Sequence, residues 1–322
     1  MRPRVPAPMS RESVTTVAQA QVPPTDSLTL DHVAHFVPRL DEAAPALERL
    51  GFTLTPFSAQ SQRLAAEEPL APAGTGNRCV MFRRGYIECL TPTGDTQIAN
   101  QLRAAIARYT GVHLIAFGTA SPELDHTRLA QHGFAPLAPV ALARPIHTSQ
   151  GEDTARFTVV RVPQEAMAEG RIQFCQHHTP QLLWQESWLA HANRAAALTA
   201  VILCVDNPAE AAARYALFTG MNTAGNGDSW HLDTQRGRLL LVTPAVVKRA
   251  FNVEPPALPW IAGYALASDH MAATRKHVAA SGYAWGNLDR RRLYVLPPRD
   301  IGGIIVFEPK AGAALDLGPR TV

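Results

Sequence analysis

His32 and Glu88 are the two residues of this chain whose chemistry stands out most from their surroundings. Each is an ionisable side chain inside an apolar, strand-like run, LDHVAHFV for the histidine and YIECL for the glutamate. An imidazole and a carboxylate together suit zinc, nickel, iron or manganese. The alternative is structural: His32 is a core histidine satisfied by hydrogen bonds, and Glu88 is a buried carboxylate paired with Arg78 or another cation. Both interpretations stay open at this level.

The elements that must position these residues form a fourfold repeat. Each copy opens with an apolar strand-like run, continues through a helix that stops at a glycine, and closes with another strand. The opening runs lie at 30–37, 112–119, 198–205 and 261–267, and the closing runs at 86–92, 174–180, 239–244 and 303–309. Three closing runs end in Thr-Pro and the fourth in Glu-Pro. Equivalent positions can therefore be compared within one chain.

That comparison singles out the first copy. At the position of His32 the third copy has Thr199 and the fourth has Ala262 or Gly263. At the position of Glu88 these copies have Leu240 and Glu308. Because one carboxylate alone is a poor metal site, the second half is expected to lack a metal.

Each copy is predicted to contain a strand, a helix and three further strands. The helices are expected to end at Gly51, Gly133, Gly220 and Gly282, because glycine readily adopts the left-handed conformation that terminates a helix. In the first copy the alternation of apolar residues predicts the last three strands at 53–57, 78–82 and 86–90. This βαβββ unit, repeated four times, predicts an α+β fold.

The repeats also suggest the domain boundaries. Residues 1–26 are predicted to be a disordered tail, in which Met9 is an alternative start to Met1. An N-terminal pair of modules with the candidate active site spans 27–182, and a linker follows at 183–196. A metal-free C-terminal pair spans 197–310, before a second tail at 311–322.

Composition and charge restrict the partners of the chain. Its net charge of +3 comes from 30 basic and 27 acidic residues without a long basic run, so nucleic acid and membrane partners are not expected. No apolar stretch approaches the roughly 20 residues of a membrane-spanning helix. A small neutral or anionic molecule is the expected ligand, and homodimer formation stays open. The four cysteines lack CxxC spacing and are predicted to be buried free thiols in a reducing cytoplasm.

A tandem βαβββ unit with His on the first strand and Glu on the last resembles the vicinal oxygen chelate superfamily, which includes glyoxalase I, extradiol dioxygenases and bleomycin-resistance proteins. The phrases GTGNRCVMFRRGYIECLTP and FCQHHTPQLLW are similar more narrowly to bacterial proteins with a glyoxalase-like domain. The resemblance covers nearly everything after residue 27. It implies four tandem βαβββ modules that form two paired-module curled mixed sheets, each around a cavity.

The resemblance also implies one metal-facing position on the first and last strand of each module. His32 and Glu88 fill two positions, and alignment of the Thr-Pro endings places Gln176 at the third. His113 is the candidate for the fourth, although counting back from the helix glycine places Leu114 there unless a β-bulge intervenes. One divalent ion (Zn, Ni, Fe or Mn) would then act as a Lewis acid.

Three further residues are candidates around this centre. His178 is a possible catalytic acid–base, alongside Glu88 acting as a base, or simply a polar strand end. Asn77 and Arg78 could orient a substrate carboxylate or carbonyl, and an exposed-strand role is the alternative.

Two functions follow from the resemblance. The first is a divalent-metal-dependent enzyme, an isomerase, lyase or dioxygenase, that acts on a small substrate with adjacent oxygens. The second is a metal-free small-molecule binding or resistance-type protein. Iron-dependent ring cleavage is disfavoured, because extradiol dioxygenases carry their iron in the C-terminal pair of modules, unless His32, His113 and Glu88 form a facial triad in the N-terminal half.

Overall fold

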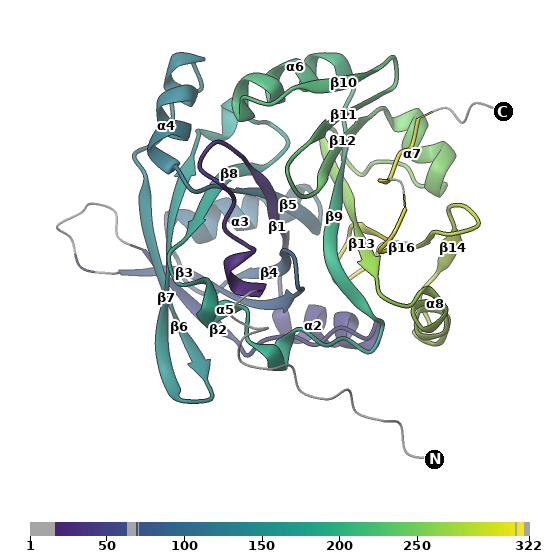
Figure 1. Cartoon of the computed structure of the whole chain (residues 1–322), viewed down its shortest axis with the longest axis horizontal. Coiled ribbons are helices and arrows are strands. Elements are labelled where there is room, and N and C mark those ends of the chain that lie inside the picture. The colour runs from purple at the N-terminus through teal and green to yellow at the C-terminus, as the bar shows by residue number, and fades with distance from the viewer. Residues whose placement is uncertain (1–16, 63–68, 70, 313, 319–322) are drawn as a thin grey trace.

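A computed structural model describes residues 17–62, 69, 71–312 and 314–318. Four βαβββ modules follow one another along the chain, as the sequence predicts (Figure 1). The first contains β1 (Thr29–Phe36), α2 (Leu40–Arg49), β2 (Ser58–Gln62), β3 (Ala71–Met81) and β4 (Tyr86–Pro92). The second contains β5 (Gly111–Gly118), α4 (Pro122–Gln131), β6 (Val140–Thr148), β7 (Gly151–Arg161) and β8 (Arg171–His177).

The two C-terminal modules repeat this order. The third contains β9 (Ala195–Cys204), α6 (Pro208–Thr219), β10 (Thr223–Asn226), β11 (Ser229–Asp233) and β12 (Arg238–Val242). The fourth contains β13 (Trp260–Ser268), α8 (Met271–Ala280), β14 (Trp285–Asn287), β15 (Leu293–Val295) and β16 (Ile304–Pro309). The fold is therefore the predicted α+β arrangement of four modules.

The first two modules close into an eight-stranded barrel, which we call the N-terminal barrel. Its strand order is β1-β4-β3-β2-β6-β7-β8-β5, and β5 pairs back with β1. The closure between modules is made by antiparallel pairing of β1 with β5 on one side and of β2 with β6 on the other. A closed barrel leaves an interior that side chains or a ligand must fill.

The last two modules form an open, curved arrangement with the order β10-β11-β12-β9-β13-β16-β15-β14. It joins the N-terminal barrel where Ile261 of β13 pairs with Val112 of β5. His35 of β1 reaches across this junction, because its Nε2 lies 3.0 Å from the hydroxyl of Tyr264 and its Nδ1 lies 3.0 Å from the carbonyl oxygen of Ile301. The two halves share one hydrophobic core here.

The turn chemistry of the sequence is largely confirmed. Gly51, Gly133, Gly220 and Gly282 all have φ between 72° and 85°, the left-handed region expected at helix ends. Three helices that the repeat does not predict lie between the modules: α3 (Gln97–Arg108), α5 (Pro180–Leu183) and α7 (Pro244–Phe251). Short 3-10 turns lie at Gln164–Ala166 and Glu186–Trp188.

The strand predicted at 53–57 is wrong, because the second strand begins at Ser58. The preceding segment instead forms hydrogen bonds with the linker through Thr53. Thr53 donates its N–H to Nδ1 of His191 at 3.0 Å and its hydroxyl to the carbonyl of Ala190 at 2.8 Å. The linker at 183–196 is thereby fastened to the N-terminal barrel.

Part of the predicted N-terminal tail is ordered. Gln21 is fully buried and donates its side-chain amide to the carbonyl of Arg83 at 2.8 Å. Residues 17–26 thus pack on the N-terminal barrel, and residues 1–16 lie outside the described part of the chain. In the second predicted tail Leu315 and Leu317 are buried, whereas 313 and 319–322 are not described.

Two expectations from composition can be checked directly. Within the described residues, no helix has the length and apolar character needed to cross a membrane. All four cysteines are buried and unpaired, as predicted.

Candidate functional site

Strand alternation divides the side chains of the N-terminal barrel into an inner and an outer set. His32 on β1, Glu88 on β4 and Leu114 on β5 belong to the inner set, and so do alternate residues of β7 and β8. The inner set surrounds a cavity with an empty volume of about 680 Å³, part of which opens to solvent. Its polar wall consists of His32, Gln60, Ser61, Gln62, Asn77, Tyr86, Glu88, Arg144, Arg161, Arg171, Gln173 and Cys175.

Two β-bulges interrupt the pairing of β1 with β5. Leu30 and His32 pair with the consecutive residues Phe117 and Ala116, so Asp31 is an extra residue on β1. In the same way His113 is an extra residue on β5, between Leu114 and Val112. A bulge re-aims side chains locally. Asp31 therefore turns toward the same end of the barrel interior as its neighbour His32.

Asp31 links two histidines. One of its carboxylate oxygens, Oδ2, lies 2.6 Å from Nδ1 of His32 and 2.9 Å from Nε2 of His177. Burial alone would raise the pKa of Asp31, but attraction to His177 and the hydrogen bonds from both imidazoles hold it well below its ordinary value. An ionised carboxylate accepts protons from both rings, so Nδ1 of His32 carries a hydrogen and Nε2 is left for the cavity.

The imidazole of His32 is also held by stacking. Its ring centroid lies 4.3 Å from that of Tyr86, with an angle of 20° between the ring planes. Burial raises the pKa of the Tyr86 hydroxyl well above its ordinary value, so this phenol stays protonated. His32 thus has a fixed orientation and a fixed hydrogen-bond partner at one nitrogen.

Glu88 is held by neutral donors. Gln60 donates its amide to Oε1 of Glu88 at 3.0 Å, and Asn77 donates to the same oxygen. The carbonyl oxygen of Asn77 in turn accepts a hydrogen bond from Nη1 of Arg144 at 2.8 Å. Arg78 instead pairs with Glu48 at 3.2 Å on the outer face. Glu88 therefore has no ion pair with Arg78, and none of the described residues donates a hydrogen bond to its second carboxylate oxygen.

Three arginines give the cavity a positive charge. Arg144, Arg161 and Arg171 all line it, and Glu88 is the carboxylate of the same wall. Arg144 contacts Asn77 and lies 5.9 Å from the ring of Phe157, whereas Nε of Arg161 donates to Gln173 at 3.1 Å. Within the described residues, which do not include 63–68, none of the three guanidinium groups lies within 4.0 Å of a carboxylate oxygen.

The electrostatics of this cluster are unfavourable without an added anion. Burial and the neighbouring charge of Arg161 lower the pKa of Arg171 to about 9, partly offset by the attraction of Glu88. Burial likewise lowers the pKa of Arg161. Because a guanidinium keeps its proton near neutral pH, Arg161 and Arg171 stay positively charged, and neither forms an ion pair with a carboxylate among the described residues. A bound carboxylate would supply such a partner.

The structure brings only some of the predicted site residues together. His32, Glu88 and Asn77 line the cavity. A β-bulge does lie at His113, but it does not turn this side chain into the cavity. Nε2 of His113 lies 2.7 Å from the carbonyl of Tyr109, and its ring stacks on that of Tyr109. Leu114 occupies the cavity position instead.

Gln176, His178 and Arg78 lie outside the cavity lining. Gln176 donates to the carbonyl of Ala120 at 2.9 Å, and Nε2 of His178 lies 2.8 Å from the hydroxyl of Thr158. The Thr-Pro alignment misplaces Gln176 because Thr91-Pro92 lies at the end of β4, whereas Thr179-Pro180 lies beyond the end of β8. The Thr-Pro alignment is therefore three residues out of register. Because three is an odd number, Gln176 points to the outer face of β8.

Strand pairing identifies the true counterpart of Glu88. Glu88 pairs with Ala34 on β1. The equivalent of Ala34 in the second module is Ala116, 82 residues later, and Ala116 pairs with Gln173 on β8. In the antiparallel β1–β5 pair, His32 lies opposite Ala116 and Ala34 lies opposite Leu114. The same offset of 82 residues therefore makes Leu114 the equivalent of His32 in the second module. The four positions at which the resemblance implies metal ligands are therefore His32, Glu88, Leu114 and Gln173.

This set does not fit a divalent ion held by protein ligands at those four positions. Leu114 has no donor atom, and the amide oxygen of Gln173 accepts a hydrogen bond from Arg161. Three guanidinium groups share the cavity and oppose a second positive charge there. The wall is better suited to an anion than to a cation.

Several residues of the site escaped the sequence analysis. Asp31 directly precedes His32, and simple alternation places it on the opposite face of the strand. Only the bulge shows that its side chain lies beside that of His32. Arg144 lies in a polar segment that does not look like a strand, although β6 contains it. Cys175 and His177 would have been found by alternation once Gln173 was assigned to the inner face.

Comparison with known proteins agrees with this architecture. The family model described as "Glyoxalase-like domain" matches residues 30–219, more than half of the chain. No curated protein matches the sequence. A crystal structure of a hypothetical protein from Staphylococcus aureus is similar with a TM-score of 0.61 at 12% identity, and the match covers 88% of this chain and 99% of that one.

Two further solved structures share the fold. A mutant of 4-hydroxymandelate synthase from Streptomyces coelicolor has a TM-score of 0.52 at 12% identity, with 89% of this chain and 95% of that chain covered. A xylose isomerase-like TIM barrel/4-hydroxyphenylpyruvate dioxygenase fusion protein has a TM-score of 0.54 at 13% identity, with coverage of 92% and 51%. At these identities the similarity concerns the fold alone.

Proposed function

The chain belongs to the glyoxalase-like domain family, and from that premise we propose that its N-terminal barrel is the site of an enzyme acting on a small organic anion with adjacent oxygens. The observation that carries the proposal is the cluster of Arg144, Arg161 and Arg171 in one cavity, without a carboxylate partner among the described residues. A guanidinium matches the planar, two-oxygen geometry of a carboxylate. The substrate class is therefore a small carboxylate with a carbonyl or hydroxyl oxygen beside it.

The rest of the wall supports the same substrate. Leu114, Leu142 and Phe157 offer apolar contacts to a short carbon skeleton. Asn77 lies between Arg144 and Glu88, so it fixes the distance between the anion-binding groups and the carboxylate. A substrate held by the arginines would lie within the same cavity as Glu88 and His32.

The arrangement favours proton transfer next to a carbonyl, as in an isomerase or a lyase. Glu88 is the proton acceptor of this proposal, because one of its oxygens faces the cavity without a hydrogen bond among the described residues. The arginines would stabilise the negative charge that develops on the substrate oxygens. A dioxygenase reaction rests only on the titles of two structural neighbours and is the weaker alternative.

A second candidate is a binding protein that encloses the anion without transforming it. The apolar part of the wall supports it, because Leu114, Leu142 and Phe157 would contact the carbon skeleton of a bound anion. Turnover separates the two candidates.

The test is a screen of the full-length protein against 2-oxo and 2-hydroxy carboxylates, each beside its uncharged methyl ester. Binding is measured by the shift in unfolding temperature and turnover by nuclear magnetic resonance of the reaction mixture. The proposal expects a carboxylate, but not its ester, to raise the unfolding temperature and to be consumed. Binding without consumption would support the second candidate, and equal shifts with ester and acid would contradict both.

A further inference from the structure

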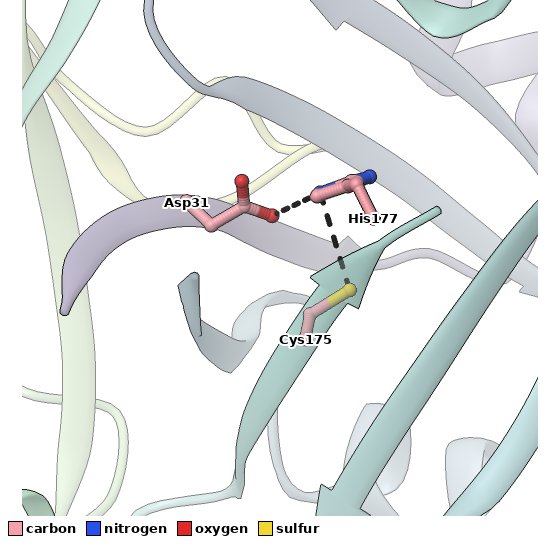
Figure 2. Close-up of side chains that lie close together, drawn as sticks. All are labelled: Asp31, Cys175 and His177. Atoms are coloured by element: carbon pink, nitrogen blue, oxygen red, sulfur yellow. Dashed lines mark hydrogen bonds and ion pairs between the residues drawn. The ribbon is translucent and has the colours of Figure 1, made fainter. Parts of the chain in front are cut away.

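A cluster of three potential metal ligands lies at one end of the N-terminal barrel, beside the cavity wall. Asp31, Cys175 and His177 each direct one donor atom to a common point, and these atoms all lie within 4.8 Å of one another (Figure 2). Nε2 of His177 is 2.9 Å from Oδ2 of Asp31 and 4.0 Å from Sγ of Cys175. None of the three occupies a metal position of the fold family, because those positions are His32, Glu88, Leu114 and Gln173.

All three side chains of the cluster are buried, and two of their polar atoms lack a partner in the described part of the chain. Asp31 is fully buried, Cys175 is 3% exposed and His177 is 6% exposed. Oδ1 of Asp31 and Nδ1 of His177 are buried without a hydrogen-bond partner among the described residues. Leaving such atoms unpaired costs about 1–3 kcal/mol each. A metal ion bound to Oδ1 of Asp31 would recover the cost at that atom.

The ring of His177 is held in place by aromatic neighbours. Its centroid lies 5.2 Å from that of Phe157, 5.0 Å from Trp184 and 6.2 Å from Tyr86, with all three pairs close to edge-on. The imidazole therefore has little freedom to turn Nε2 away from Asp31 and Cys175. Metal sites depend on this kind of fixed ligand orientation.

We propose that Asp31, Cys175 and His177 form a site for one zinc-class transition-metal ion. With bonds of about 2.0–2.3 Å, tetrahedral geometry separates ligand atoms by roughly 3.3–3.8 Å. The separations of 2.9 and 4.0 Å around Nε2 of His177 lie on either side of that range. Small movements of the three side chains would bring the separations into that range, and a ligand from outside the protein would occupy the fourth tetrahedral position.

The donor types select the ion. A thiolate, an imidazole and a carboxylate favour Zn²⁺ or Co²⁺ over Mg²⁺ or Ca²⁺. On binding, the Cys175 thiol releases its proton to solvent, and the neutral His177 ring moves its proton from Nε2 to Nδ1, so that the Nε2 lone pair can bind the metal. Oδ2 of Asp31 can keep its contact with His32 while Oδ1 serves the metal. Because Cys175 also lines the cavity, the ion would lie at the cavity wall, where the thiolate of Cys175 and the carboxylate of Asp31 would neutralise its two positive charges.

The test uses Co²⁺ as the spectroscopic probe and the full-length protein after dialysis against a chelator. The expected result is one Co²⁺ per chain and a thiolate-to-cobalt charge-transfer absorption. Cys175→Ser removes that absorption and weakens binding about 100-fold or more, and His177→Gln weakens binding by at least about tenfold. The matched control, Cys204→Ser, changes a buried free cysteine in the C-terminal half and retains both properties.

Three outcomes would overturn the site. They are no Co²⁺ binding by the wild-type protein, binding without charge-transfer absorption, and equal affinity in wild type and Cys175→Ser. Loss of binding in Glu88→Gln with retention in Cys175→Ser would place the metal at the fold-family position instead. The wild-type spectrum tests the site without any substitution. For each variant, circular dichroism in the presence of the chelator verifies that the protein is folded. Anion binding by the arginines is measured separately, so either proposal can fail alone.

Discussion

Asp31 holds His32 through a 2.6 Å contact between Oδ2 and Nδ1, and the same oxygen lies 2.9 Å from His177. One buried carboxylate thus orients an imidazole that lines the cavity. The β-bulge makes this possible, because without the extra residue Asp31 and His32 would point to opposite faces of β1.

The first prediction concerns the tautomer of His32. In chelator-treated protein the proton should reside on Nδ1, because the ionised Asp31 accepts it. Asp31→Asn should give a mixture of tautomers, since an amide can donate as well as accept. Long-range proton–nitrogen correlation spectra of the imidazole measure this directly. Asp41→Asn, which changes an exposed aspartate paired with Arg39, is the control. A wild-type proton on Nε2 would refute the assignment.

The second prediction separates binding from turnover at Glu88. Glu88→Gln removes the carboxylate charge from the cavity wall but can still accept hydrogen bonds from Gln60 and Asn77. Anion affinity should rise by roughly five- to tenfold, because one repulsive charge is lost. Turnover should fall about 100-fold or more, because an amide accepts no proton. Calorimetry and steady-state rates measure the two effects, and unchanged turnover would exclude Glu88 as the base.

The third prediction concerns acid stability. Burial lowers the pKa of His191 to about 4, despite the hydrogen bond to Met81. Between pH 6.5 and about 4 the unfolded chain binds a proton that the folded chain does not, so stability falls as the pH falls through this window. His191 should contribute about 2 kcal/mol of the loss between pH 7.5 and 5.0.

Urea unfolding of His191→Gln at these two pH values measures that contribution. The variant should lose less stability on acidification than the wild type, whereas His132→Gln, at an exposed helix end, should behave like the wild type. An unchanged acid dependence in His191→Gln would show that the histidine is not the titrating group.

The fourth prediction concerns the turn before β4. Gly85 has a φ of 72°, and a Cβ atom there would lie 2.7 Å from the carbonyl oxygen of Asp31. Gly133 has a φ of 78°, but a Cβ atom there would meet nothing within 4 Å. Gly133→Ala should therefore cost about 1 kcal/mol of unfolding free energy from backbone strain, and Gly85→Ala about 2–4 kcal/mol. Chemical denaturation compares them, and equal costs would refute the close approach.

The repeat made the fold predictable. Strand openings, terminal glycines and closing strands each have a local sequence signal, and all four modules were identified from them. The closure of β2 against β6 was not predictable, because Ser58–Gln62 is a polar strand without the alternation of apolar residues that marks a half-buried strand. Its pairing depends on closing the barrel rather than on local pattern.

The site was predictable only where one copy differs from the others. His32 and Glu88 stood out because they occur together in one copy only, and the structure places both in the cavity. Asp31 was missed because a bulge breaks the alternation on which parity arguments rest. The arginines were missed because each is an ordinary charged residue until the barrel closes and brings three strands around one space.

Isothermal titration calorimetry of an Arg171→Gln variant tests the central claim, that the arginines of the N-terminal barrel bind an organic anion. The titrant is the carboxylate that raises the unfolding temperature most in the screen. Arg171→Gln should bind it about 10- to 100-fold more weakly than the wild type, because a charge-assisted hydrogen bond is lost. Arg103→Gln, which changes an exposed arginine on α3, should bind it like wild type. Equal affinity of wild type and Arg171→Gln would contradict the claim.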